Sequence, residues 1–203
     1  SNRIHHAWIF TGPFGVGKRT TAEAFAALLL DPTTAPNLAG ELEPDEGSHT
    51  QQLIRSGAHP DLHIVTKELA EFSREANVRS SRERPVAVAV GRDFLLEPAQ
   101  QSAVQRTDAR ARKVFIIDEA HLMARAGANA ALKMLEEPPR GVVFILITHE
   151  ESGLLPTIRS RCQRIAFAPL DESAMLEWLK REGLKLDAAQ KKWLLDFADG
   201  SPG

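Results

Sequence analysis

The chain has 203 residues, of which 43% are hydrophobic and 26% are charged, and its formal net charge is -2. This composition is typical of a folded globular protein, and it excludes a disordered chain and a strongly basic nucleic-acid-binding protein. The length allows one α/β domain with a small appendage, but not two full catalytic domains. Cys162 is the only cysteine, which excludes an internal disulfide and a cysteine-rich zinc site and fits a reducing, cytoplasmic location.

The first predicted unit is a strand, a glycine-rich loop and a helix. Residues 7–10 form a short apolar run, and the Ala- and Leu-rich segment 20–30 favours a buried helix. The stretch that follows, 31–60, begins rich in Pro, Gly and acidic residues without periodicity, which indicates a surface loop or insertion. A second strand is predicted at 62–65.

Strands and helices alternate in the middle of the chain. The further predicted elements are an apolar segment at 86–90, a helix at 94–105, strands at 113–117 and 142–147, and a helix between them at 121–136. This alternation predicts a doubly wound α/β fold with a parallel sheet between helices. In such a fold the ligand site lies at the carboxyl edge of the strands.

The pattern changes after residue 169 and predicts a small helical lid. Asp171 is a suitable N-cap for a helix with one apolar stripe, and a second helix is predicted at 187–198. We therefore divide the chain into an α/β domain, 1–169, and a lid, 170–203.

A glycine-rich loop follows the first predicted strand. In this context glycines let the backbone curl so that amides point at a phosphate, the helix N-terminus adds positive potential, and a lysine neutralises the outer phosphates. The alternative is a glycine turn that only joins strand to helix, which the spacing, the lysine and the context together disfavour. The sequence predicts a phosphate-binding loop formed by Gly12, Pro13, Gly15, Val16, Gly17, Lys18, Arg19 and Thr20.

The residue after the lysine departs from the usual pattern of such loops. A Ser or Thr is expected there to hold Mg²⁺, and this chain has Arg19. Thr20 does not simply take over, because one step along a helix turns a side chain by about 100° and points it elsewhere. We therefore expect that ATP or ADP can bind, that Mg²⁺ is in doubt, and that hydrolysis is weak or absent.

Two acidic residues, Asp118 and Glu119, follow the strand at 113–117. There Asp118 can hold the water shell of a metal ion, and Glu119 can orient and deprotonate an attacking water. A helix N-cap followed by a first-turn acid is the alternative, and both roles can coexist. Asp-Glu-Ala-His also spells the box of a helicase superfamily, but those motors need two such domains and this chain has room for one.

Two further residues are candidates with open alternatives. Thr148 follows the strand at 142–147, where its hydroxyl would reach the terminal phosphate, but a β-former at a strand end is an equal alternative. Arg161 follows a short helical segment predicted at 154–158, and it could enter a neighbouring subunit's site or simply be solvated. The seven histidines have no metal-ligand spacing, so we predict no metal site.

Several stretches resemble the AAA+ clamp-loader subunits of bacterial DNA polymerase III. Leu-Glu-Glu-Pro-Pro and Ser-Arg-Cys are specific to that family, whereas Gly-x-His-Pro-Asp-Leu resembles its delta-prime type more than its gamma/tau motor type. The resemblance covers most of the chain from residue 5 to about 170, and it implies a RecA-like AAA+ P-loop NTPase domain followed by the small helical lid. The resembling stretches are 6–18, 57–62, 117–123, 135–139 and 155–163.

The resemblance also implies a role for each candidate residue. Arg161 would be an arginine finger offered in trans to the ATP site of an adjacent gamma/tau motor, and Thr148 would be the first sensor. The nucleotide site's own residues would be Lys18, Asp118 and Glu119.

Two departures from the family pattern affect the expectations. The family commonly has a four-cysteine zinc module in the region corresponding to 31–55, and no cysteine occurs there, so we expect no zinc. A second sensor arginine and a collar domain would follow Gly203, so we expect a truncated lid and no collar in this sequence.

The expected function is that of a stator in the DNA polymerase III holoenzyme, a DNA-directed DNA polymerase and nucleotidyltransferase assembly. The implied partners are the gamma/tau and delta subunits, the sliding clamp and primed DNA, with direct DNA contact left open. One alternative is a gamma/tau-type motor subunit with its own ATPase activity, which Arg19 disfavours. Another is a stand-alone AAA+ ATPase that remodels proteins, which homohexamer formation would favour.

Overall fold

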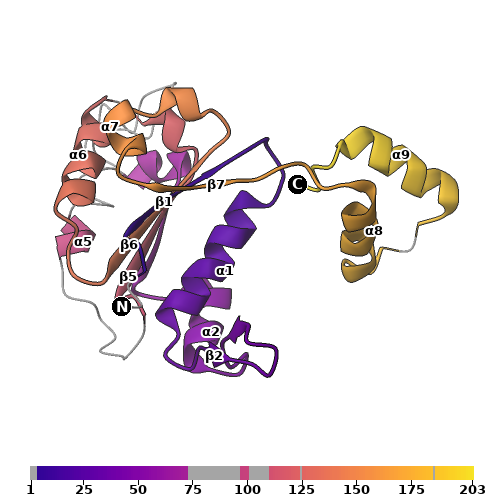
Figure 1. Cartoon of the computed structure of the whole chain (residues 1–203), viewed down its shortest axis with the longest axis horizontal. Helices are drawn as coiled ribbons and strands as arrows, with labels where there is room; N and C mark the ends of the chain where they lie inside the picture. The colour runs from indigo at the N-terminus through magenta and orange to yellow at the C-terminus, as the bar shows by residue number, and fades with distance from the viewer. Residues whose placement is uncertain (1–3, 73–96, 101–109, 124, 185) are drawn as a thin grey trace.

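The computed structural model describes residues 4–72, 97–100, 110–123, 125–184 and 186–203. Its centre is a five-stranded sheet of order β4-β5-β6-β1-β7 in which neighbouring strands are parallel (Figure 1). Its strands are β1 (Ala7–Thr11), β4 (Leu62–Val65), β5 (Lys113–Ile117), β6 (Val142–Thr148) and β7 (Gln163–Ala166). The α-helices are α1 (Lys18–Leu30), α2 (His49–Arg55), α5 (Glu97–Gln100), α6 (Arg125–Glu136), α7 (Pro156–Arg159), α8 (Glu172–Arg181) and α9 (Ala188–Ala198).

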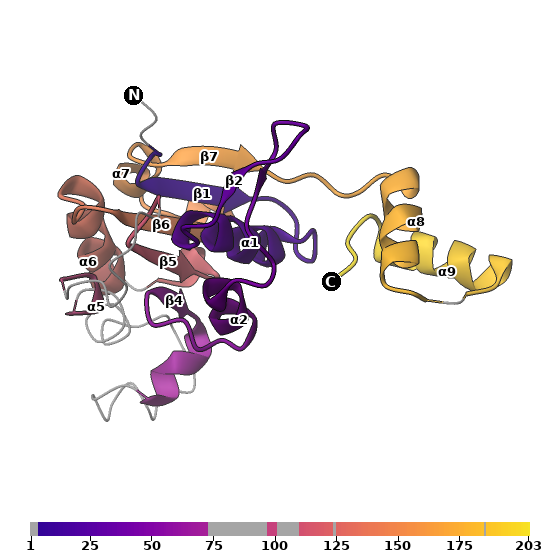
Figure 2. The same ribbon diagram turned by 90° about the horizontal axis from the view of Figure 1, so that it is seen from below.

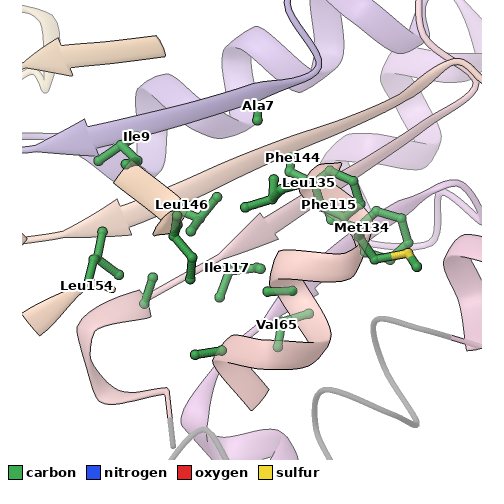
Figure 3. Close-up of a cluster of buried hydrophobic side chains, with 14 of the residues drawn as sticks. Ala7, Ile9, Val65, Phe115, Ile117, Met134, Leu135, Phe144, Leu146 and Leu154 are labelled. Atoms are coloured by element: carbon green, nitrogen blue, oxygen red, sulfur yellow. The ribbon is translucent and has the colours of Figure 1, made fainter. Parts of the chain in front are cut away.

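The sheet is buried on both faces, as expected for a doubly wound fold. Strands β5 and β6 consist mainly of β-branched and aromatic residues and are buried along their whole length. One face packs on α1 through a cluster that includes Phe10, Leu29 and Ile145. The other face packs on α6 and α7, and there Phe115 and Phe144 stack with ring centroids 5.4 Å apart (Figure 3). The predicted α/β class is confirmed.

The strand order places the glycine loop at a topological switch. The chain runs from β1 to the edge strand β4, returns through β5 and β6, and then crosses β1 to form β7. Ligands of open parallel sheets bind outside the carboxyl ends of the strands at such a point. Thr11, the last residue of β1, is level with Thr148 on β6 and with Ala166 on β7.

Two predicted helices have different starting points in the structure. Helix α1 begins at Lys18, two residues before the predicted start, because Gly17 already forms its N-cap. The helix predicted at 121–136 begins only at Arg125. Before it, Glu119 takes a left-handed conformation and a 3-10 helix occupies Ala120–Leu122, which breaks a continuous α-helix.

Some elements were not predicted or lie outside the described residues. Strand β7 escaped prediction because its four residues are exposed and half polar, which hides the alternation of a strand. The short helical segment predicted at 154–158 is found as α7, preceded by a 3-10 helix at Glu151–Gly153. The apolar segment at 86–90 lies outside the described residues, and of the helix predicted at 94–105 only α5 is described.

The segment predicted as a loop or insertion, 31–60, is folded. It contains a two-strand ladder, β2 (Ala35–Pro36) and β3 (Leu42–Glu43), and then α2. Asp31 organises it, because this buried carboxylate accepts hydrogen bonds from Ser48, Gln51 and Thr33. Burial alone would raise the pKa of Asp31, but these hydrogen bonds hold it below its usual value.

A pair of helices stands apart from the sheet. An extended stretch after β7 leads to α8 and α9, which lie beyond the start of α1 (Figures 1 and 2). Asp171 caps α8, and Asp187 forms a capping box with α9, as the sequence predicts. On α9, Trp193 and Phe197 stack at 5.2 Å and are exposed. Both lid helices are confirmed, whereas the division at residue 169 stays a prediction. In the described part of the chain, no helix is long and apolar enough to cross a membrane.

Candidate functional site

The loop between β1 and α1 follows the curled path that the glycines predict. The φ angles of Gly12, Gly15 and Gly17 are 147°, 78° and 84°, in the region that favours glycine. Gly15 is constrained in a second way, because a Cβ there would lie 2.0 Å from the carbonyl oxygen of Gly203. Gly17 caps α1 without a side chain, which leaves the first amides of the helix free of side-chain partners from the cap. These amides carry the positive end of the helix dipole.

The side chain of Lys18 folds back over its own loop. Its Nζ donates to the carbonyl oxygen of Gly12 at 2.8 Å and to that of Pro13. Only 7% of the residue is exposed. Burial lowers the pKa of Lys18, and the nearby charge of Asp118 partly opposes this. The ammonium group of Lys18 therefore already lies at the loop. A bound phosphate would replace the carbonyl oxygens of Gly12 and Pro13 as its partner.

A cavity of about 340 Å³ opens beside this loop. Its size is in the range of small-molecule sites. The C-terminal segment closes one side, because the N–H of Gly203 donates to the carbonyl oxygen of Gly15 at 3.1 Å. The cavity brings together the loop, the ends of β5 and β6, and this segment. Its lining residues are Phe14, Gly15, Gly17, Lys18, Arg19, Thr20, Asp118, Glu119, Ile147, Thr148, His149 and Gly203.

Arg19 lies on the wall of this cavity and bridges two carboxylates. Its Nε donates to Glu23 at 2.9 Å, and its Nη1 lies 3.4 Å from Oδ2 of Asp118. The hydrogen bond to Glu23 is the largest of the effects that raise the pKa of Arg19, so the guanidinium is charged. Thr20 also lines the cavity. The expectation that its hydroxyl does not replace that of the usual Ser or Thr stays a prediction.

Asp118 and Glu119 follow β5 as predicted, and both are held by the chain itself. The Oδ1 of Asp118 accepts the N–H of Glu119 at 2.9 Å, while its Oδ2 faces Arg19. The Oε2 of Glu119 lies 2.9 Å from Nζ of Lys67. Glu119 also has a φ of 46°, an uncommon conformation for a residue other than glycine, and such strain concentrates at functional sites.

Thr148 is buried at the end of β6, and its hydroxyl is fully used. It donates to the carbonyl oxygen of Glu150 at 2.9 Å and accepts the N–H of Glu150 at 3.0 Å. Nδ1 of His121 lies 3.1 Å from the same oxygen, and it donates to Thr148 in the tautomer that carries the ring proton on Nδ1. In this conformation Thr148 has no proton left for a phosphate oxygen.

Arg161 lies outside the cavity, after α7. Its Nη2 is 2.9 Å from Oε1 of Glu136, and its Nη1 donates to the carbonyl oxygen of Thr157 at 2.9 Å. The side chain is 36% exposed, so the guanidinium is neither packed into the core nor turned toward its own phosphate loop. The neighbouring Cys162 is half-buried, and burial raises the pKa of its thiol to about 12.

Lys67, His149 and Gly203 were not predicted as part of the site. A signal existed for Lys67, because it follows the end of β4 at the same sheet edge as Asp118 and Glu119. His149 follows β6 in the same way. Gly203 carried no signal, since its place depends on the return of the chain from the lid.

Among the described residues, no group of three or more His, Cys, Asp or Glu side chains is arranged to hold a metal ion. His59 and His63, at the edge strand β4, are instead buried or half-buried beside the core. Burial lowers the pKa of both, which favours the neutral form. The expectation that the chain holds no zinc stays a prediction.

Comparison with known families places the chain among replication proteins. A family model described as "DNA polymerase III, delta subunit" matches residues 1–171. The chain belongs to this family. Among relatives of this DNA polymerase III family member, the delta' subunit of Pseudomonas aeruginosa is 36% identical over 97% of this chain and 53% of its own length. The delta' subunit of Bacillus subtilis is 34% identical over 86% of this chain and 45% of its own length.

The family member is also similar to the motor type of subunit. The gamma/tau subunit of Mycobacterium tuberculosis is 31% identical over 100% of this chain and 32% of its own length. The chain therefore spans about half or less of the length of these relatives.

Solved structures support the fold. A gamma subunit-related protein from Thermotoga maritima matches with a TM-score of 0.54 and 20% identity over 97% of this chain and 52% of that one. The RuvB Holliday junction branch migration motor of Thermotoga maritima matches with a TM-score of 0.55 and 16% identity over 97% and 50%. At these identities the likeness concerns the fold alone, and it confirms the AAA+ architecture.

Proposed function

We propose that this chain acts as a delta-prime-type stator of a bacterial clamp loader. Such a subunit hydrolyses little or no ATP itself and completes the ATP-driven complex that places the sliding clamp on primed DNA in the cytoplasm. Its partners would be gamma/tau and delta subunits, the clamp and, directly or indirectly, the DNA. Family membership and similarity to delta' relatives support this proposal. The observation that carries it is the contrast between Arg19, inside the chain's own cavity, and Arg161, outside it.

Weak hydrolysis follows from the state of the three residues that would act on the attacking water and the metal. The two oxygens of Asp118 contact the N–H of Glu119 and the guanidinium of Arg19, and the hydroxyl of Thr148 donates its hydrogen bond to the carbonyl oxygen of Glu150. Glu119 would have to release Lys67 before it could orient and deprotonate a water. Each of these steps requires breaking an interaction within the chain, which adds to the barrier.

Arg161 is suited to act on a neighbouring subunit. The guanidinium is exposed enough to be reached, it is charged at all physiological pH values, and its single carboxylate partner is itself 45% exposed. A surface ion pair of this kind contributes at most about 1 kcal/mol, so a phosphate on a partner can compete for the guanidinium. An arginine that reaches a neighbouring γ-phosphate contributes on the order of 10³ to 10⁵ in rate.

The test uses the full-length protein with its cognate gamma/tau and delta subunits, clamp and primed DNA, and it measures ATP turnover. Replacing Arg161 by alanine should remove most of the turnover that this chain stimulates, while the assembled complex still elutes intact in gel filtration. Arg164→Ala is a matched control, because Arg164 lies three residues away and pairs with Glu151 at 2.7 Å. Equal turnover for Arg161→Ala and the unmodified protein would reject the finger role.

A gamma/tau-type motor is the second candidate, because the similarity to gamma/tau relatives covers the whole chain. This candidate requires magnesium-dependent ATP turnover by the chain alone. Steady release of phosphate at rates of about 1 per second or more would favour the motor over the stator.

A further inference from the structure

Each of the two acidic residues that line the cavity forms an ion pair with a basic side chain of the same chain. Arg19 faces Asp118 with a separation of 3.4 Å between Nη1 and Oδ2, and Lys67 faces Glu119 with a separation of 2.9 Å. Arg19 extends from the first turn of α1, whereas Lys67 follows β4. Because these residues come from different elements, the pairing is a product of the fold rather than of local sequence.

A magnesium ion does not fit this arrangement. Mg²⁺ requires oxygen ligands in near-ideal octahedral geometry at 2.0–2.1 Å. In phosphate-loop enzymes the hydroxyl after the lysine supplies one ligand, and the acid at the end of the neighbouring strand assists. Here a guanidinium, which has five donors and no acceptor, stands in place of the hydroxyl. Each oxygen of Asp118 also has a partner already, since Oδ1 accepts a backbone N–H and Oδ2 faces that guanidinium.

We infer that Arg19 replaces the metal ion, so that this cavity binds the polyphosphate of a nucleoside di- or triphosphate without a divalent cation. The inference rests on the nucleotide site assumed in the proposed function, but not on clamp loading. Arg19 has five N–H donors, of which its Nε contact with Glu23 and its Nη1 contact with Asp118 engage two. No other described residue engages the remaining donors, which can meet phosphate oxygens in the forked geometry that guanidinium groups favour.

The charges of the cavity agree with this reading. On the wall of the cavity, Lys18 and Arg19 are balanced by Asp118 and Glu119, and the two ion-pair partners outside the lining residues, Lys67 and Glu23, balance each other. The N-terminus of α1 adds about half a positive charge. The helix N-terminus therefore gives this balanced site a small excess of positive potential, which suits a free polyphosphate. A bound dication would place two further positive charges beside a guanidinium, so the magnesium complex of the nucleotide should bind more weakly than the free nucleotide.

The experiment measures the affinity of the 203-residue chain for ATP and for ADP by isothermal titration calorimetry, in EDTA and in excess Mg²⁺. We expect ATP to bind at least as tightly in EDTA as in Mg²⁺. Arg19→Thr, which restores the usual hydroxyl, should weaken binding in EDTA by about 10- to 100-fold, the loss expected for a charged hydrogen bond. The same variant should regain affinity when Mg²⁺ is added.

Arg55→Thr is the matched control, because Arg55, the last residue of α2, is a surface arginine that pairs with Glu46 and does not line the cavity. Its ATP affinity should equal that of the unmodified chain in both buffers. Thermal unfolding checks that each variant is folded.

Three results would overturn the inference. These are an unmodified chain that needs Mg²⁺ to bind ATP, an Arg19→Thr variant that binds as the unmodified chain does in EDTA, and a folded chain that binds no nucleotide in either buffer. The last result would remove the nucleotide site while leaving the stator role to be decided by the Arg161 experiment, so the two proposals can fail separately.

Discussion

Arg19 and Arg161 carry the same charged group in two different settings. Arg19 lies on the wall of the chain's own cavity and faces Asp118, an acid that a hydrolytic site would need for the metal. Arg161 lies outside the cavity and faces Glu136, for which we find no other role. The comparison teaches that the effect of an arginine on phosphate chemistry depends on what its partner would otherwise do. Arg19 pairs with an acid that metal binding would need, whereas Arg161 pairs with an acid from which a phosphate on a partner subunit can draw it away.

The largest expected effect comes from undoing both ion pairs of the cavity at once. The double variant Arg19→Thr with Lys67→Ala frees Asp118 and Glu119, so we expect magnesium-dependent ATP turnover to rise about 100-fold or more over the unmodified chain. General-base catalysis typically contributes 10²–10⁴ in rate. Phosphate release by the isolated chain is the measurement. Unchanged turnover despite intact nucleotide binding would mean that Thr148, rather than the acids, holds the site inactive.

A smaller effect, on ATP affinity and on stability, is expected from adding a side chain at Gly15 in the phosphate loop. Gly15→Ala places a Cβ against the carbonyl oxygen of Gly203 and strains a φ of 78°, so the loop must shift. We expect about a tenfold loss of ATP affinity and a loss of about 1–3 kcal/mol in the free energy of unfolding.

Gly57→Ala is the control for this variant, because Gly57 has a φ of 68° and no atom of the described residues lies within 4 Å of the added Cβ. It should cost about 1 kcal/mol of stability and leave ATP affinity unchanged. If both variants lost nucleotide affinity equally, the effect would come from general destabilisation and not from the loop.

Thr148→Val tests whether the cavity is held together by bonds within the chain. The change keeps the shape but leaves the N–H and carbonyl oxygen of Glu150 without the hydroxyl, at a cost of about 1–3 kcal/mol in a urea unfolding experiment. Thr157→Val, at an exposed position of α7, should change stability by less than about 0.5 kcal/mol. Similar losses for the two variants would contradict the importance of the Thr148 hydrogen bonds.

The smallest effect concerns the partner of Arg161. Glu136→Gln removes a surface ion pair, so the free energy of unfolding should fall by less than about 1 kcal/mol, and added salt should reduce the difference. Glu137→Gln is the control, since Glu137 makes no ion pair with any described residue. A loss of several kcal/mol would mean that Arg161 has a structural role in this chain and is not available to a partner subunit.

The site could be predicted from the sequence where a single segment carries the chemistry. The phosphate loop and the acids after β5 are such segments, because glycine spacing and polar residues after an apolar run are visible without the fold. The pair of Arg19 and Glu23 was not predicted, because the helix was expected to begin only at residue 20, although residues four apart share a helix face.

The rest of the site depends on which strands are neighbours. Val65 on β4 is level with Ile117 on β5, so the residues two positions further on, Lys67 and Glu119, meet at the sheet edge. The sequence pattern of a single segment does not show which residues of two neighbouring strands are level with each other. The hydrogen bonds of Thr148 with Glu150 and His121 were hidden for the same reason, because they depend on how the chain turns after β6.

The contact between Gly203 and Gly15 also constrains how the two lid helices can move. The lid leaves the sheet through the stretch after β7, where the N–H of Leu170 donates to the carbonyl oxygen of Gly200 at 2.8 Å. It returns to the sheet through the hydrogen bond between Gly203 and Gly15. The lid and the phosphate loop are therefore in direct contact, so a displacement of the lid that breaks this hydrogen bond also changes the surroundings of Gly15 and of the cavity beside it.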